Sequence, residues 1–228
     1  IGEKAFLGCT SLESITIPES VTKIGEKTFS GCRSLKSITI PKSVTEIGYQ
    51  AFKNCSSLES VVLSEGMTTI GKEAFYLCTS LKNITIPKSV TKILNHAFGS
   101  CCLLESIVIP KGVTNINEHA FTGCVTLKNV IIPEGVTNIY DHAFSGCTSL
   151  ESVTIPESVT VIWNGVFKDC TSLKSATIPE SVTEIGESAF YRCASLESIV
   201  IPKGVKKIWP FAFSYCTSLT TVTLPVGV

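Results

Sequence analysis

Net charge of either sign is missing from this 228-residue chain, because 19 Lys and Arg side chains balance 19 Asp and Glu side chains. A neutral chain lacks the positive surface that attracts nucleic acids or anionic membranes, so neither is expected as a partner. Long apolar runs are missing as well, since Ser, Thr, Lys or Glu interrupts them every few residues, and we expect no membrane insertion. The first residues carry no signal peptide, which leaves secretion undecided.

Patterns that mark catalysis are also absent from the sequence. No Ser-His-Asp arrangement, nucleotide-binding loop or pair of carboxylates stands out, and the chain has no room for long functional loops. We therefore expect a protein that is not an enzyme and that needs no cofactor.

What the sequence does contain is a repeat with a strict period of 23 residues. No insertion or deletion interrupts its columns. The cysteine column is Cys9, Cys32, Cys55, Cys78, Cys101, Cys124, Cys147, Cys170, Cys193 and Cys216. The phenylalanine column is Phe6, Phe29, Phe52, Phe75, Phe98, Phe121, Phe144, Phe167, Phe190 and Phe213. A leucine column, which we count as offset 0, runs from Leu12 through Leu35 and Leu58 to Leu219.

The pattern within each repeat predicts one strand followed by turns. Apolar residues at offsets +3 and +5 alternate with polar ones, which is the period of a strand, and the proline that follows ends it. Offsets +12 to +20 are too short for a full helix and favour a turn or a short 3₁₀ segment. A single repeat cannot bury its apolar face alone, so neighbouring repeats must stack.

We therefore predict a single leucine-rich repeat solenoid over residues 1–228. It would be right-handed, with about ten coils, little helix, a parallel β-sheet on the concave face and turns on the convex side. The Phe column would form an inner spine. One continuous sheet would contain Ile15, Ile38, Val61, Ile84, Ile107, Val130, Val153, Ala176, Ile199 and Val222.

The pattern Leu-x-x-Ile-x-Ile-Pro-x-x-Val-x-x-Ile-Gly-x-x-Ala-Phe-x-x-Cys resembles the BspA-like family of leucine-rich repeats, a Treponema-type class with a 23-residue repeat. The resemblance covers the whole chain. It implies a surface-exposed or secreted protein, of the kind found in anaerobic bacteria and some parasitic protists, that adheres to host matrix proteins or to other cells. The family has no common catalytic residues, so none is carried over.

Offsets +1, +2 and +4 should face outward from the predicted sheet. Offset +1 alternates between Glu and Lys from Glu13 to Glu197, which would place opposite charges on adjacent strands. Offset +2 is mostly Ser, with Asn129 among the exceptions, and offset +4 is mostly Thr. At offset +4, Val62, Val108, Ile131 and Val200 replace Thr. This smooth face is either a partner-binding surface or only a row of good strand formers.

Offset +13 is the column that varies most. It is Gly in five repeats, which suggests positive φ or a close backbone approach, but Tyr140 and Trp163 replace Gly in adjacent repeats. These rings either project outward, as a partner or glycan site beside His119 and His142, or fold back over the neighbouring turn. His96, His119 and His142 occupy offset +15 in three consecutive repeats. They are weak candidates for a metal site and otherwise solvated turn residues.

The cysteine column lies at a core offset, and we expect it to be buried and reduced rather than disulfide-bonded. Cys102 lies outside the column and is expected to be an exposed thiol. Ile1 and Val228 fall at core offsets of incomplete repeats, which predicts a chain truncated within repeats and able to associate end to end.

Two classes of function fit these observations. The first is a binding module outside the cell that recognises an extracellular matrix or cell-surface protein. A glycan-binding module that uses the aromatic column is a variant of it. The second is a passive spacer or stalk that holds another domain.

Overall fold

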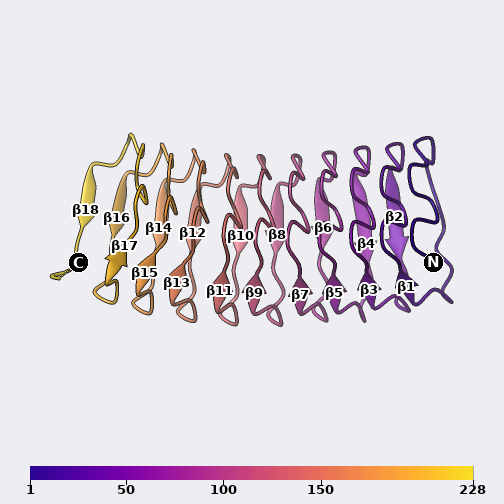
Figure 1. The fold of residues 1–228 in the computed structure, drawn as a ribbon, viewed down its shortest axis with the longest axis horizontal. Coiled ribbons are helices and arrows are strands. Elements are labelled where there is room, and N and C mark those ends of the chain that lie inside the picture. Colours follow the sequence, from indigo (N-terminus) through magenta and orange to yellow (C-terminus); the bar gives the residue numbers. More distant parts are fainter. Residues whose placement is uncertain (228) are drawn as a thin grey trace.

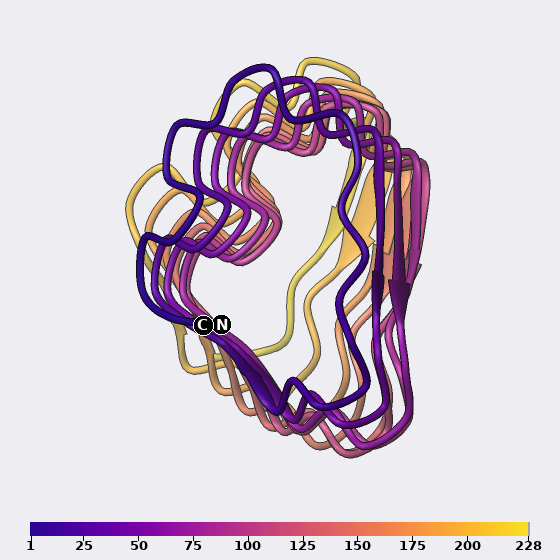
Figure 2. The same ribbon diagram turned by 90° about the vertical axis from the view of Figure 1, so that its right-hand side faces the viewer.

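The computed structural model describes residues 1–227, which form one stack of coils made of short parallel strands and turns (Figure 1). Figure 2 looks along the stack from its N-terminal end and shows that each coil follows the same path. The chain runs clockwise as it recedes from the viewer, so the stack is a right-handed solenoid. These residues contain no helix, as the sequence predicts. Val228, which we assigned to a core offset, lies outside the described residues.

The longer strands occupy offsets +2 to +5, where the alternating pattern predicts them. Their inward residues are buried and their outward residues are exposed, as the burial pattern of β2 shows. Neighbouring strands pair in parallel with residues one repeat apart in register, for example Ile38 with Val61. These strands are β2 (Ser37–Ile40), β4 (Ser60–Leu63), β6 (Asn83–Thr85), β8 (Ser106–Val108), β10 (Asn129–Ile131), β12 (Ser152–Thr154), β14 (Ser175–Thr177), β16 (Ser198–Val200) and β18 (Thr221–Thr223).

The prediction that these strands form one continuous sheet was wrong. They form four separate groups, β2-β4-β6, β8-β10, β12-β14 and β16-β18, and Ile15 lies in no strand. The Lys128 amide donates to the Glu105 carbonyl at 3.0 Å within a group, whereas the Glu105 amide is 3.4 Å from the Lys82 carbonyl between groups. Strands of three residues share few hydrogen bonds, so a few tenths of an ångström between coils are enough to interrupt the ladder.

The continuous sheet lies elsewhere, at offsets +11 and +12, where we expected the turn region to begin. Nine two-residue strands pair in parallel along the whole stack, with an Ile at offset +12 facing inward. They are β1 (Lys23–Ile24), β3 (Glu46–Ile47), β5 (Thr69–Ile70), β7 (Lys92–Ile93), β9 (Asn115–Ile116), β11 (Asn138–Ile139), β13 (Val161–Ile162), β15 (Glu184–Ile185) and β17 (Lys207–Ile208). Turns follow in each coil, and none of them is a 3₁₀ helix within residues 1–227.

The turns also join coil to coil through the backbone. The amides of Gln50, Phe52 and Asn54 donate to carbonyls of the next coil at 2.8–2.9 Å, and equivalent bonds recur along the stack. Offsets +15 and +19, here Gln50 and Asn54, adopt left-handed backbone with φ of 54° and 59°. This geometry turns alternate amides toward the next coil, so the bend satisfies its backbone without forming a strand.

The phenylalanine column forms the predicted inner spine. Consecutive rings stack with centroids 5.2–5.8 Å apart. Every ring from Phe29 to Phe190 is fully buried. The spine confirms that the apolar columns make one core shared by all coils.

The eight column cysteines from Cys32 to Cys193 are buried in the core and form no disulfide, as predicted. Each thiol donates a hydrogen bond to the Phe carbonyl 26 residues earlier, as Cys78 does to Phe52 at 3.1 Å. Burial raises the pKa of the Cys78 thiol to about 12, so it stays protonated and unreactive. Cys102 is half-buried rather than exposed, because its thiol turns back toward the Ser100 carbonyl at 3.5 Å, and Cys9 is exposed.

Thiol labelling of the native protein tests this arrangement. We expect Cys9 to react rapidly, Cys102 and Cys216 to react slowly, and the eight buried thiols to react only after denaturation, because burial removes both access and thiolate character. Mass spectrometry of labelled peptides would identify the sites. Rapid native labelling of Cys101 or Cys124 would contradict a closed core.

Candidate functional site

The outward side of the longer strands, which we call the strand face, carries three of the predicted partner-binding residues close together. Val62, Val108 and Ile131 are 56%, 60% and 62% exposed, and Ile131 pairs directly with Val108 in register. Asn129 is exposed on the same strand as Ile131. The three aliphatic side chains therefore lie within four consecutive coils, with only Thr85 between Val62 and Val108 in the row.

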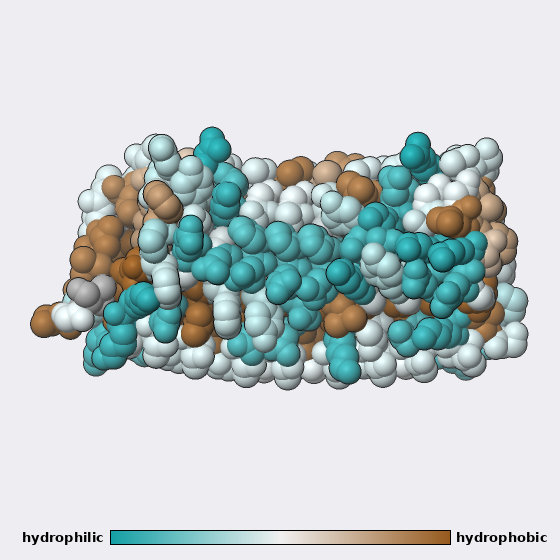
Figure 3. Space-filling model, in the orientation of Figure 1, coloured by the Kyte–Doolittle hydropathy of each residue, from teal (hydrophilic) through white to brown (hydrophobic). Residues whose placement is uncertain are grey.

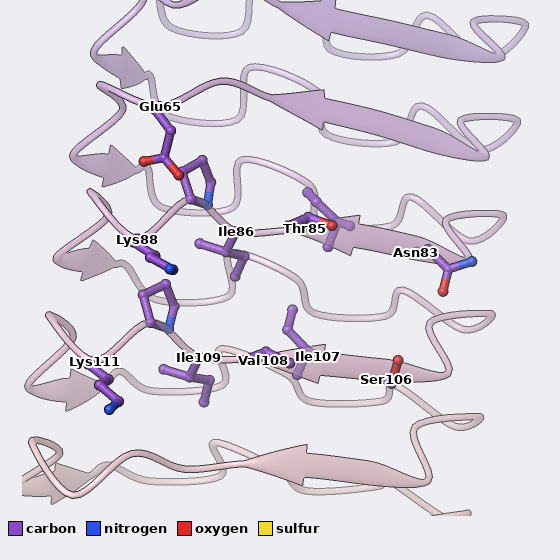
Figure 4. A pocket seen from close by; sticks show the side chains of 13 residues that line it. Glu65, Asn83, Thr85, Ile86, Lys88, Ser106, Ile107, Val108, Ile109 and Lys111 are labelled. Atoms are coloured by element: carbon purple, nitrogen blue, oxygen red, sulfur yellow. The ribbon is translucent and has the colours of Figure 1, made fainter.

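A groove opens beside this row, between β6 and β8, where the hydrogen-bonded ladder is interrupted. Its volume is about 730 Å³. Figure 4 shows Ile86, Ile109 and Val108 lining its middle, while Lys88 and Lys111 lie with Glu65 at one side. Sequence reasoning picked out Val108 but missed the groove, because most of the residues that line it are ordinary for their offsets.

The alternating charges of offset +1 form discrete ion pairs rather than an unbroken ladder. Lys36, Lys82 and Lys174 each approach the Glu of the preceding coil at 3.0–3.3 Å, and all of these side chains are more than half exposed. Exposed pairs of this kind contribute roughly 0–1 kcal/mol each. Their main effect is therefore on register, since a slip by one coil would place like charges together.

On the opposite side of each coil, the structure decides between the two expectations about glycine at offset +13. Neither Gly48 nor Gly71 has a positive φ, but a Cβ on Gly71 would collide with the Ile47 carbonyl oxygen. The requirement is therefore close backbone approach, and the positive φ values occur at offsets +15 and +19 instead. Of the rings that replace Gly, Tyr140 is half-buried and Trp163 is 37% exposed, with centroids 5.5 Å apart.

The three histidines of offset +15 stack on one another. The rings of His96 and His119 are nearly parallel with centroids 4.4 Å apart, and those of His119 and His142 are 4.9 Å apart. Nitrogen lone pairs lie in the ring plane, so parallel stacked imidazoles do not direct three nitrogens at one ion. Within residues 1–227, no three His, Cys, Asp or Glu side chains gather to hold a metal ion.

The surroundings of His96 and His119 favour their neutral imidazoles. Burial lowers the pKa of the His119 imidazole, and the neighbouring His96 and His142 lower it further. Burial also lowers the pKa of His96, against the opposing effect of Glu73.

The Tyr140–Trp163 pair is separate from the histidine stack. In the described part of the chain, no ring stacking joins Tyr140 or Trp163 to a histidine. Figure 3 shows the hydrophilic band that runs along the side with these turns.

Comparison with known proteins places this architecture in a family. The pattern described as the BspA type leucine rich repeat region, in six copies, matches residues 1–128 and 95–220. The chain belongs to the family of BspA-type leucine-rich repeat proteins. The resemblance noted from the Pro, Ala-Phe and Cys columns is thus confirmed, and with it a repeat architecture typical of binding scaffolds.

Solved structures of the same kind agree with this assignment. A leucine-rich repeat protein from Bacteroides ovatus is 30% identical, with a TM-score of 0.53 over 100% of this chain and 76% of that one. A leucine rich cell surface protein from Faecalibacterium prausnitzii is 30% identical, with a TM-score of 0.54 over 98% and 82%. The T. pallidum leucine rich repeat protein is 27% identical, with a TM-score of 0.57 over 80% and 77%.

Curated proteins provide no further comparison, since none of them matches the chain. Among residues 1–227 there is also no helix with the length and apolar character needed to span a membrane.

The histidine stack leads to a prediction about pH. Unfolded histidines bind protons near pH 6.5, whereas His96 and His119 do so only at lower pH in the folded chain. The unfolded state therefore binds more protons below about pH 6.5, and stability should fall as the pH drops through this window toward the folded pKa values. The urea midpoint of His119→Gln should fall less than that of the wild type between about pH 7.5 and about pH 5.5.

Gln is a suitable replacement because Gln50 already occupies the same offset with the same left-handed backbone. The pKa of Glu73, a carboxylate near the stack, lies below its ordinary value: burial acts to raise it, but hydrogen bonds from Lys53 and Gln50 outweigh burial and lower it. Identical pH dependence of the wild type and the variant would show that the stack contributes nothing.

Proposed function

We propose that this chain is a non-enzymatic binding module that adheres to a protein ligand outside the cell, an extracellular matrix or cell-surface protein. The main support for this proposal is the exposed aliphatic row of Val62, Val108 and Ile131 beside the groove between β6 and β8. Exposed aliphatic side chains next to a groove favour burial against a partner.

The chemistry of the strand face indicates an extended segment of a protein as the ligand. The Ser and Thr side chains around the aliphatic row are short, so a partner backbone can approach closely. An aliphatic side chain of the partner would enter the groove between Ile86 and Ile109, while Lys88 and Lys111 would meet an acidic neighbour in its sequence. Asn129, beside Ile131, would donate to or accept from the partner backbone.

A location at the cell surface is the other part of the proposal. The F. prausnitzii relative is described as a cell surface protein, and the family resemblance supports the same location for this chain. A passive stalk remains the competing function, and it predicts that no ligand is held by the strand face.

Substitution of the aliphatic row tests the proposal. Binding of the chain to a panel of immobilised extracellular-matrix proteins and to intact host cells would be measured by surface plasmon resonance and by cell attachment. The double variant Val108→Asp, Ile131→Asp should lose about tenfold or more in affinity, because it places two charges in a contact that excludes water.

Val200→Asp is the matched control, since Val200 has the same offset and exposure but lies far along the stack from the groove. We expect it to bind within about twofold of the wild type. The wild type binding none of these surfaces, or the double variant binding as well as Val200→Asp, would remove the proposal and favour the stalk.

A further inference from the structure

The continuous nine-stranded sheet loses its charged side chains in three consecutive coils. Offset +11 faces outward in this sheet, and it is Lys or Glu in five of the nine strands found within residues 1–227, while β5 has Thr69 there. In β9, β11 and β13 it is Asn115, Asn138 and Val161. Offset +13 of the same coils is Asn117, Tyr140 and Trp163. We call this area the neutral patch and define it by Thr114, Asn115, Asn117, Thr137, Asn138, Tyr140, Val161 and Trp163.

Amide and hydroxyl groups in the neutral patch repeat from coil to coil. The Asn138 Nδ2 donates to the Asn115 Oδ1 at 2.9 Å, and each of these amides also donates to the hydroxyl of the preceding Thr. The Oδ1 of Asn138 and the Oδ1 of Asn117 accept no hydrogen bond from residues 1–227, so both are open to a ligand. Carboxamides and hydroxyls both donate and accept, which complements a ligand rich in hydroxyl groups.

Trp163 and Trp209 differ in whether a charged side chain contacts the indole. The Trp209 Nε1 donates to Glu184 at 3.0 Å, and the Lys207 ammonium lies over the Trp209 ring at 3.2 Å from its centroid. In the described part of the chain the Trp163 Nε1 has no acceptor and its ring no cation, although both indoles are exposed to a similar degree. The position that follows Trp163 in the column is Gly186, which carries no side chain.

We propose that the neutral patch is a carbohydrate-binding site for a neutral oligosaccharide that lies along the axis of the solenoid. The Trp163 indole, with Tyr140 beside it, would stack on the apolar face of one pyranose ring, and the amides of Asn138 and Asn117 would bond the hydroxyls of the next sugars. An extended β-linked polysaccharide advances by nearly one coil spacing per sugar, so equivalent groups on successive coils meet equivalent hydroxyls.

The composition of the patch favours a neutral sugar over a charged glycan. Sulfated and sialylated glycans are favoured by Lys or Arg, whose charged donors make the stronger hydrogen bonds to acidic groups. Neither cation occurs within the patch. The site is separate from the strand face, because offsets +11 and +13 belong to the other sheet, so it adds a second ligand class to the proposed function.

Fluorescence titration with neutral oligosaccharides tests the inference, because the chain contains only two tryptophans. In the Trp209→Phe variant, emission reports Trp163 alone. We expect β-linked gluco-, manno- or xylo-hexaoses to shift that emission to the blue at saturable concentrations. The reciprocal Trp163→Phe variant, which reports Trp209, should show no shift.

The affinity of variants for the oligosaccharide, measured by calorimetry, identifies the residues that bind it. Trp163→Gly should lose about tenfold or more, since a stacked indole is removed, and Gly is the residue that the same column carries at Gly71 and Gly186, so the fold accepts it. Trp209→Gly is the matched control and should bind within about twofold of the wild type. The strand-face variant Val108→Asp, Ile131→Asp should also bind sugar normally, so failure of either site is visible without the other.

Three results would overturn the inference. They are no saturable binding of any neutral hexaose, equal losses in Trp163→Gly and Trp209→Gly, or binding restricted to sulfated or sialylated oligosaccharides. Loss of a protein ligand in Trp163→Gly, with no sugar bound by the wild type, would reassign the neutral patch to protein recognition.

Discussion

Every part of this protein depends on contacts between one coil and the next. A 23-residue coil has no interior of its own: its Phe ring, Cys thiol and Leu side chain become buried only when neighbouring coils stack on it. Backbone amides of the bend, such as Phe52, also find their acceptors in the next coil. An inserted residue would break the stacking of the Phe spine and the backbone ladder together, which explains why the period is strict.

The same constraint limits what the surface can do. A site has to be assembled from side chains repeated at the coil spacing, so residues on successive coils lie side by side and point in parallel. The stacked rings of His96, His119 and His142 illustrate the result, since they pack on one another instead of converging on an ion. Such a surface suits extended, repetitive ligands better than the converging geometry that catalysis or metal binding requires.

Variation between coils is therefore where function resides. The inner columns hardly change, whereas the exposed columns change over short stretches: the aliphatic row at offset +4, the histidines at offset +15 and the uncharged residues of the neutral patch. These stretches fall on different sides of the coil, and several of them lie in the central coils. A protein built in this way can hold a protein segment on one side and a sugar chain on another without either site disturbing the core.

The sequence by itself determined the solenoid, the inward columns and the family, because the period and the alternation of apolar residues state directly which side chains must be covered. It also placed Val62, Val108 and Ile131 on an outward row. Only the tertiary structure decided how the coils pair: the continuous sheet lies at offsets +11 and +12, the longer strands separate into groups, and the groove opens at one of these separations. It also decided that Cys102 turns inward and that Trp209, but not Trp163, is held by a hydrogen bond and a cation contact. These features depend on differences of tenths of an ångström between coils and on side-chain neighbours 23 residues apart, which a repeating pattern does not record.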